Sequence, residues 1–188
     1  MQKIISLFQR NYDGDRLVRD EIVPGAEWVQ AGEGTATQKH DGTCCLVRGG
    51  RLFKRYEVKK GKKPPQNFEA ASDTDANTGK QQGWVPVGDG PEDRWHREAF
   101  SDQPDGTYEL CGPKVQGNPE CMESHQLIPH GSVTVESPRT FSELRVWFTD
   151  RDIEGVVWHH SDGRMVKIKA KDFGIKRVAR GVEGTHVV

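Results

Sequence analysis

The chain has 188 residues, of which 34% are hydrophobic, and its 27 basic and 28 acidic residues leave a net charge of −1. Five tryptophans and seven phenylalanines can build a core at this length, which excludes wholesale disorder. No stretch approaches about 18 apolar residues and no charged-then-apolar leader opens the sequence, so neither a membrane span nor a secretory signal is expected. We therefore expect one cytoplasmic domain over residues 1–188, with no separate accessory domain.

The first half of the sequence predicts a hairpin followed by a long loop. Residues 43–48 and 51–58 flank Gly49-Gly50, a pattern typical of two antiparallel strands joined by a tight turn. Residues 59–83 are rich in Lys, Pro, Asn, Asp, Ser and Gln and predict a long loop, and such loops are often functional. Ordered structure is expected to resume at 84–87.

The second half predicts short strands and one helix. Thr140 and Glu143 have the spacing of a capping box, and apolar residues at helical spacing follow them. The predicted strands are 107–111, 126–128, 153–158 and 165–168, the last two joined by a turn at 161–163. Because strands outnumber helices, we expect an α+β domain built on an antiparallel β-sheet with flanking helices.

Basic residues gather in two segments, 48–63 and 164–180, and each segment contains a single acidic residue. Two basic segments in a chain without net basic charge favour a local site for an anion. Two solvated strands would give the same pattern, so charge alone leaves both interpretations open.

The cysteines show no C-x-x-C spacing and no matching histidine pattern. A zinc site with four protein ligands is therefore not expected. Buried reduced thiols in a reducing compartment are the better interpretation. The four are Cys44, Cys45, Cys111 and Cys121.

The lysine pair at 167 and 169 is the first sign of chemistry. On a strand, Lys167 and Lys169 point to one face while Ile168 points to the other. Two lysines on one face suit a polyphosphate with its metal ion, although two solvent-facing lysines opposite a core residue would look the same. Because the sequence contains neither a P-loop nor a G-x-G-x-x-G turn, a covalent route through a lysine is the natural alternative for nucleotide chemistry.

Four motifs in order complete the pattern: Lys39-x-Asp41-Gly42, the strand glutamate Glu109, Glu154-Gly155-Val156-Val157, and Lys167-x-Lys169. They resemble the signature motifs of the covalent nucleotidyltransferases, the superfamily of ATP-dependent DNA ligases, RNA ligases and mRNA capping enzymes. Longer segments resemble more specifically a eukaryotic-type 5′-to-3′ RNA ligase family related to the phage type 1 enzymes. These segments are 39–45, 83–87, 108–113, 117–119, 128–131 and 154–159.

The resemblance implies that Lys39 is the catalytic nucleophile. Its amine would attack the α-phosphorus of ATP, expel pyrophosphate and form lysyl-AMP with the help of Mg²⁺, or of Mn²⁺ in its place. AMP would then pass to an RNA 5′-phosphate, and a 3′-hydroxyl would displace it to seal the strand. Lys167, Lys169 and Glu154 are implied as further catalytic residues, the two lysines by lowering the pKa of Lys39 and by offsetting phosphate charge.

The resemblance also implies an ATP-binding set: Gln38, Asp41, Gly42, Arg55, Glu109, Ile128, His130 and Val157. Glu109 and Glu154 are the expected carboxylates for metal and ribose, and which does which stays open. The strand at 126–130 lacks the aromatic residue on which many relatives stack adenine, so Ile128 or His130 would serve, with Val157 covering the other side. Adjacent strand residues face opposite ways, so only one of Lys54 and Arg55 can serve the ribose end.

The expected partner is RNA with 5′-phosphate and 3′-hydroxyl ends, and the lysine run at 59–63 is a candidate contact for its phosphates. A bare nucleotidyltransferase core would also leave room for a protein partner that supplies further grip on RNA. The alternatives on the same chemistry are a capping-type guanylyltransferase and a DNA ligase core. The alternative from another class is a non-catalytic module that binds RNA ends.

Overall fold

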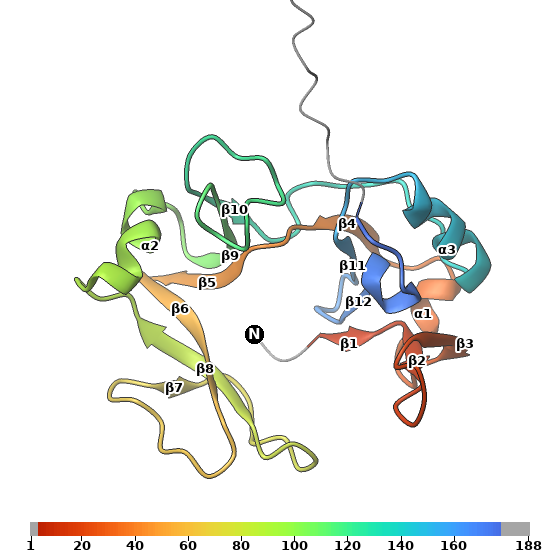
Figure 1. Ribbon diagram of the computed structural model, residues 1–188, viewed down its shortest axis with the longest axis horizontal. Coiled ribbons are helices and arrows are strands. Elements are labelled where there is room, and N and C mark those ends of the chain that lie inside the picture. Colours follow the sequence, from red (N-terminus) through yellow and green to blue (C-terminus); the bar gives the residue numbers. More distant parts are fainter. Residues whose placement is uncertain (1–3, 178–188) are drawn as a thin grey trace, which may run out of the picture. The chain divides into compact units, whose positions relative to one another are not determined.

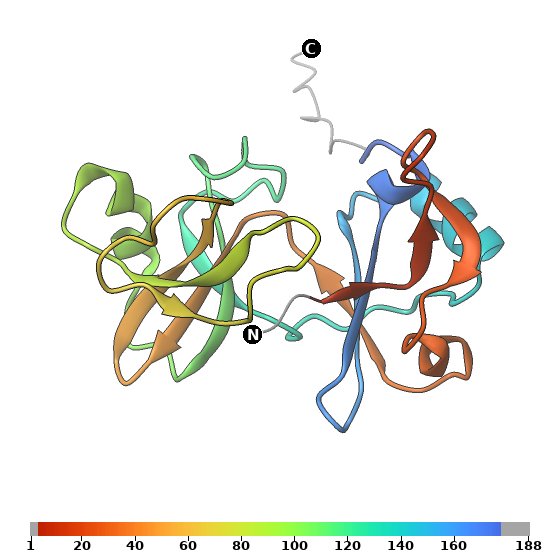
Figure 2. The same ribbon diagram turned by 90° about the horizontal axis from the view of Figure 1, so that it is seen from below.

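A computed structural model of the chain describes residues 4–177 (Figures 1 and 2). The last three residues of the basic segment 164–180 therefore lie outside the described residues. The chain divides into two compact units at 39/40 and at 133/134. We call residues 5–39 with 134–177 the Lys39 unit, and residues 40–133 the Glu109 unit.

The Lys39 unit contains a four-stranded sheet in the order β1-β12-β11-β4. Strand β11 pairs antiparallel with both β12 and β4, whereas β1 pairs parallel with β12. A separate antiparallel pair, β2 with β3, belongs to the same unit. The elements are β1 (Ile5–Ser6), β2 (Phe8–Arg10), β3 (Val18–Ile22), α1 (Glu27–Gln30), β4 (Thr35–Lys39), α3 (Phe141–Thr149), β11 (Gly155–His159), β12 (Met165–Lys169) and the 3₁₀ turn η2 (Ala170–Phe173).

One face of the four-stranded sheet forms the core of the Lys39 unit. Val156 and Trp158 of β11 and Ile168 of β12 are fully buried there, and their spacing of two residues places Val156 and Trp158 on the same face of the strand. The helix α3 contributes Leu144 and Phe148, which are four residues apart and so lie on one helical face. Burying this face leaves the alternate strand residues, among them the lysines, on the other side of the sheet.

The Glu109 unit contains a six-stranded sheet in the order β10-β9-β5-β6-β8-β7, in which every neighbouring pair is antiparallel. Its core includes Cys45, Val47, Leu110 and Leu127, with Ala99 contributed by the helix α2. The elements are β5 (Thr43–Arg48), β6 (Arg51–Val58), β7 (Glu69–Ala70), β8 (Gln81–Pro86), the 3₁₀ turn η1 (Pro91–Asp93), α2 (Arg94–Ala99), β9 (Gly106–Cys111) and β10 (Gln126–Pro129).

The predicted α+β class with antiparallel sheets is confirmed, and both predicted hairpins are present. In the first hairpin, Gly49 and Gly50 have φ of 57° and 68°, which is the conformation that a two-residue hairpin turn requires. The predicted loop at 59–83 contains the short strand β7 and the start of β8. No helix within the described residues is long and apolar enough to cross a bilayer.

The predicted capping box of α3 is wrong. Thr140 is the N-cap residue, but it makes no side-chain bond to the helix backbone. Its hydroxyl instead donates to the Glu143 carboxylate at 2.5 Å. The two side chains therefore bond to each other, and the Thr140 hydroxyl donates to a charged acceptor instead of accepting from the helix backbone.

Candidate active site

The strand register brings the predicted catalytic lysines onto one face of the Lys39 unit. Lys39, the last residue of β4, lies opposite Gly155 of β11, and Gly155 lies opposite Lys169 of β12. Lys167 is two residues before Lys169 and so shares its side of the sheet. The hairpin β11–β12 and its neighbour β4 can be followed in Figure 2. We call this surface, formed by Lys39, Lys167 and Lys169, the lysine face.

Glu154 lies between two of these lysines. Its Oε2 is 2.6 Å from Lys39 Nζ, and its Oε1 is 3.4 Å from Lys169 Nζ. The side chains of Lys39 and Glu154 are 21% and 12% exposed, so this pair is largely withdrawn from water. The sequence-predicted residues Lys39, Glu154 and Lys169 are thus in direct contact, although Lys39 and Glu154 are 115 residues apart in the chain.

Burial, together with crowding of like charge, lowers the pKa values of two lysines on this face. The pKa of Lys167 falls from 10.5 to about 8, chiefly because the side chain is buried and also because Lys169 and Lys39 are nearby cations. Burial lowers the pKa of Lys169 as well, and Lys39 adds to that effect. Lys39 and Lys169 both contact Glu154, and the gathering of three lysines makes the lysine face suited to binding an anion such as a polyphosphate.

Gly155 sits at the centre of this arrangement. A Cβ atom there would lie 2.3 Å from the backbone oxygen of Ile168 and 3.0 Å from Cα of Lys169, closer than side chains approach backbone atoms. Because Gly155 has no side chain, β11 and β12 can run close together at this point, where Gly155 lies between Lys39 and Lys169 in the register. This close approach gives a steric reason for the glycine in the Glu154-Gly155 sequence of the motif.

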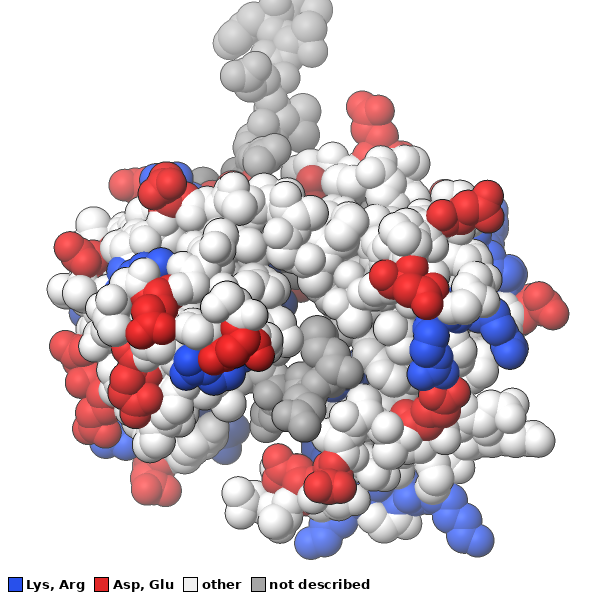
Figure 3. Space-filling view, turned by 180° about the vertical axis from the view of Figure 1, so that it is seen from behind, with Lys and Arg blue, Asp and Glu red and all other residues white. Residues whose placement is uncertain are grey.

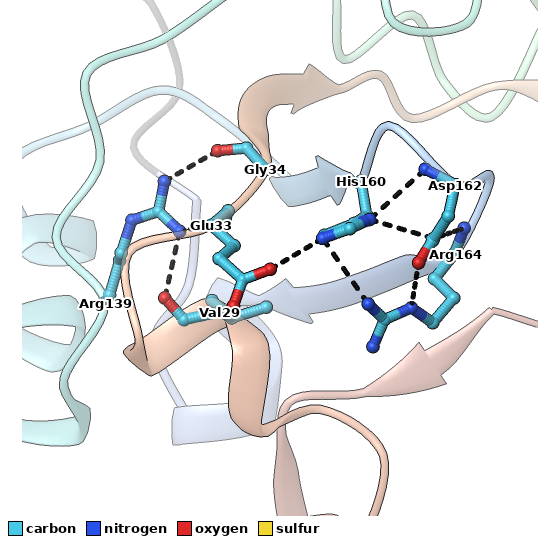
Figure 4. A network of polar contacts seen from close by, with 7 residues as sticks. All are labelled: Val29, Glu33, Gly34, Arg139, His160, Asp162 and Arg164. Atoms are coloured by element: carbon cyan, nitrogen blue, oxygen red, sulfur yellow. Dashed lines mark hydrogen bonds and ion pairs between the residues drawn. The ribbon is translucent and has the colours of Figure 1, made fainter.

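A polar network holds the segment that leads into β4 (Figure 4). The Arg139 guanidinium donates to three backbone oxygens, those of Val29 at 2.9 Å, of Gly34 at 2.8 Å and of Glu33. The Glu33 carboxylate is also 2.7 Å from His160 Nε2, just beyond the end of β11. These contacts tie the start of β4 to the end of β11, which supports the register that places Lys39 beside Glu154.

Glu109 stands in a second polar cluster, in the Glu109 unit. In the sheet it lies between Cys44 of β5 and Ile128 of β10. Its Oε2 is 2.8 Å from His130 Nε2, and its Oε1 accepts from the Gly42 backbone N–H at 3.1 Å. A Cβ atom on Gly42 would lie 2.1 Å from the backbone oxygen of Leu110, so only glycine allows this approach. The predicted residues Gly42, Glu109, Ile128 and His130 therefore do come together.

The adjacent residues Lys54 and Arg55 face opposite sides of the sheet. Lys54 forms an ion pair with Asp93, which is 2% exposed and also accepts from the Gly88 backbone N–H at 2.7 Å. Arg55 lies over the Trp84 ring at 5.0 Å. The register places Arg55 on the same sheet face as Glu109, so of the two it is the one that fits the predicted role.

The remaining predicted residues are placed as follows. Gln38 lies opposite Val156 and therefore on the other sheet face from Lys39. Val157 is buried on the lysine face, beside Thr37 and Lys167 in the register. The backbone N–H of Asp41 donates to the Glu120 carboxylate at 2.8 Å, and both residues belong to the Glu109 unit. Lys39 belongs to the other unit, so the Lys-x-Asp-Gly motif spans the division of the chain.

Sequence reasoning missed several residues that support these groups. Asp172 accepts from the Lys169 backbone N–H at 3.0 Å and from the Arg10 guanidinium at 2.5 Å, which fixes the end of β12. Arg139 was also missed, and Cys44 was predicted as one of four buried thiols, whereas Cys44 is half-buried and Cys121 is exposed. The contacts of Asp172 with Arg10 and of Arg139 with residues 29–34 join distant parts of the chain, so only a known tertiary structure could have identified them, whereas Asp172 lies just three residues after Lys169.

The charged surface is mixed. The lysine run at 59–63 is exposed, as both a solvated loop and a contact for RNA phosphates would require. On the face drawn in Figure 3, acidic and basic side chains of the described residues are interspersed. That face therefore carries no continuous basic field among the described residues.

The fold and the lysine face together define an antiparallel α+β protein with a strand surface suited to anions. The sequence profile of a family described as RNA ligase 1 matches residues 95–182. RNA ligase 1 of Danio rerio is 34% identical over 87 residues, which cover 41% of this chain and 27% of that protein. RNA ligase 1 of Mus musculus is 27% identical over 218 aligned positions, which cover 74% of this chain and 67% of that protein.

The predicted resemblance to an RNA ligase family is therefore confirmed. The matched region spans 27% of the zebrafish relative and 67% of the mouse relative. RNA ligase 1 of Pongo abelii is similar over a comparable short region, 35% identical over 86 residues.

Proposed function

We propose that this chain is an ATP-dependent RNA ligase in which Lys39 becomes adenylylated before AMP passes to an RNA 5′-phosphate. The observation that carries the proposal is the contact of Lys39 with Glu154, on a sheet face that also presents Lys167 and Lys169. The similarity to RNA ligase 1 proteins supports the same conclusion. We propose a cytoplasmic location together with this activity.

The chemical demand on Lys39 explains its surroundings. A lysine with an ordinary pKa of about 10.4 is neutral in only about one molecule in 2,500 at pH 7, which costs roughly 4.6 kcal/mol. Nearby cations lower that cost, and Lys167 and Lys169 are cations on the same face. Glu154 acts in the opposite direction, because its carboxylate favours the charged amine. Lys39 becomes a nucleophile once this ion pair opens and its ammonium group loses a proton to solvent.

Lys167 and Lys169 have a second role in the proposal. Nucleotidyl transfer moves negative charge onto the departing pyrophosphate, and fixed cations beside that charge stabilise the transition state. Both lysines are largely buried, so their charge is less screened than it would be in water.

Glu109 and Glu154 are the residues proposed to hold Mg²⁺ or the ribose hydroxyls. Both offer carboxylate oxygens, the type of ligand that Mg²⁺ takes in phosphate-binding sites, and Mn²⁺ accepts the same ligands. Bound Mg²⁺ would supply further positive charge against the phosphates. Polar contacts hold both carboxylates in place. Glu154 contacts the amines of Lys39 and Lys169. Glu109 contacts the Gly42 backbone N–H and the His130 ring.

The remaining proposed roles concern ATP and RNA. Gln38, Asp41, Arg55 and Val157 are proposed for ATP, with Ile128 or His130 against the adenine. RNA with a 5′-phosphate and a 3′-hydroxyl is the proposed substrate, and the exposed lysine run at 59–63 is proposed to contact its phosphates. A protein partner would supply contacts to RNA in addition to those of this lysine run.

The test is covalent labelling of the purified protein with each α-labelled nucleoside triphosphate and Mg²⁺, followed by denaturing electrophoresis. Lys39→Arg is the informative variant, because arginine keeps the positive charge beside Glu154 but cannot lose its proton. Lys114→Ala, which removes an exposed lysine of the Glu109 unit, is the matched control. We expect label from ATP on the wild type and on Lys114→Ala, and none on Lys39→Arg.

Mapping the labelled peptide distinguishes the alternatives. An adduct on Lys39 supports the proposal, whereas an adduct on Lys167, whose pKa is lowered to about 8, would move the nucleophile within the same face. Label from GTP alone would indicate a capping-type enzyme, and sealing of DNA in preference to RNA would indicate a DNA ligase core. Absence of label with every nucleotide and metal would leave an RNA-end-binding module.

A further inference from the structure

Three side chains from different strands bring sulfur, oxygen and nitrogen donors together in the Glu109 unit. A ligand atom of Cys44, one of Glu109 and one of His130 all lie within 4.8 Å of one another. Cys44 and Glu109 are direct neighbours across β5 and β9, and His130 follows β10 on the other side of Glu109. The strand pairing therefore fixes all three donors on one face of the sheet.

We propose that Cys44, Glu109 and His130 form a binding site for a zinc-type divalent cation. Two zinc ligands in tetrahedral geometry lie about 3.4 Å apart, so small side-chain movements from the present spacing would close the site. A thiolate, a carboxylate and a neutral imidazole also carry two negative charges in total, which balance a dication. The fourth position would stay open to water or to an oxygen of a substrate.

The surroundings of the cluster support this inference. The Gly42 backbone N–H holds Oε1 of Glu109, as the outer partners of metal ligands commonly do. His130 Nδ1 is buried and has no hydrogen-bond partner among residues 4–177, so one of the two ring nitrogens lacks a hydrogen bond there. His125, in the same unit, offers a contrast, since its two nitrogens contact Glu98 and the backbone N–H of Lys114.

The chemical types of the three donor atoms determine which metal ions the site favours. Thiolate and imidazole ligands favour zinc and similar transition metals, whereas Mg²⁺ takes oxygen ligands in octahedral geometry. The side chains of Glu109 and His130 are 11% and 26% exposed, which leaves the cluster shielded but open to an entering ion. Cys45, the neighbouring cysteine, lies in the core on the opposite face, and burial raises the pKa of its thiol, so it does not compete as a ligand.

A functional consequence rests on the proposed function. If Glu109 binds ATP or its Mg²⁺, a zinc ion held by Cys44 and His130 would also coordinate the Glu109 carboxylate and so prevent that binding. Zinc would then inhibit self-adenylylation of the wild-type protein, whereas the Cys44→Ser variant would resist inhibition. Metal binding itself does not require ATP and is measured without it.

The experiment uses the full chain, freed of metal, with Co²⁺ as a spectroscopic probe and Zn²⁺ as a competitor. We expect one equivalent of Co²⁺ to give a thiolate-to-cobalt charge-transfer band that Zn²⁺ abolishes and millimolar Mg²⁺ does not. Cys44→Ser should remove the band and weaken Zn²⁺ binding by more than about 100-fold, since even outer-partner changes cost roughly 10- to 100-fold. Cys121→Ser, which alters an exposed cysteine outside the cluster, is the matched control and should behave as the wild type.

Three results would overturn the site: no charge-transfer band in the wild type, a band that persists in Cys44→Ser, or displacement by Mg²⁺. The first needs no variant and so is independent of any effect of substitution on folding. Failure of the proposed function gives a different result, in which the band forms and zinc binds but no nucleotide labels the protein with Mg²⁺.

Discussion

Replacing Lys167 with methionine should stabilise the protein at neutral pH while abolishing its proposed activity. The pKa of Lys167 is about 8 in the folded protein, against 10.5 for a lysine in water, so folding disfavours its charged form. At about 1.4 kcal/mol per pH unit, this difference corresponds to about 3 kcal/mol. Methionine keeps an unbranched side chain of similar length without the charge, so we expect a gain of about 1–3 kcal/mol in the free energy of unfolding.

The sign of the pH dependence follows from proton binding. Between pH 8 and 10.5 the unfolded chain holds a proton on Lys167 that the folded chain has lost, so wild-type stability rises with pH across this window. Below it, both states are protonated and the full penalty of the buried charge is present. The advantage of Lys167→Met should therefore be largest below pH 8 and should shrink as the pH approaches 10.5.

Urea unfolding of the two proteins, followed by tryptophan fluorescence at roughly pH 7 and roughly pH 10, measures this difference. Lys176→Met is the matched control, because it removes an exposed lysine of the same unit and should change stability by less than about 0.5 kcal/mol. The reasoning would be refuted if Lys167→Met were no more stable than the wild type at neutral pH. A gain of equal size at both pH values would also refute it, since the cause would then not be the charge.

Two single substitutions and one combined substitution test other parts of the molecule. Glu154→Gln keeps the shape of the side chain but loses the carboxylate proposed to bind Mg²⁺ or ribose, and should lower the labelling rate with ATP by at least about 100-fold; a near-normal rate would contradict the assignment. Lys54→Met leaves buried Asp93 without its cation, and should cost about 3–5 kcal/mol in urea unfolding; a change below about 1 kcal/mol would show that the pair is dispensable. Neutralising the lysine run at 59–63 should weaken RNA sealing more than labelling, and should flatten the salt dependence of sealing; equal loss in both assays would make the run structural.

Local patterns allowed much of the strand structure to be predicted. The Gly49-Gly50 pair predicted a hairpin because both residues adopt positive φ without strain, and the structure has that turn. The alternation in Lys167-Ile168-Lys169 predicted two lysines on one face and a core residue on the other, and Ile168 is fully buried. Both predictions depend only on neighbours in the sequence.

Long-range pairing could not be predicted in the same way. No local signal pairs β4 with β11, which are more than a hundred residues apart, yet this pairing puts Lys39 beside Glu154. The division of the chain into two units also went unpredicted, because it falls inside the Lys-x-Asp-Gly motif and no linker composition marks it. The capping box failed for a related reason, since the spacing of Thr140 and Glu143 does not show whether their side chains bond to the helix backbone or to each other.

The lysine face illustrates how stability and the proposed function oppose each other. Three partly buried ammonium groups on one sheet face repel one another, and a protein selected for stability alone would place apolar or neutral residues there. The opposite face, with Val156, Trp158 and Ile168 fully buried, supplies the packing that offsets this repulsion. An anion with several negative charges would remove the repulsion on binding. The Lys39–Glu154 pair completes the arrangement: it holds the Lys39 amine in place, and under the proposed function a bound nucleotide would have to separate the two groups before the amine could attack.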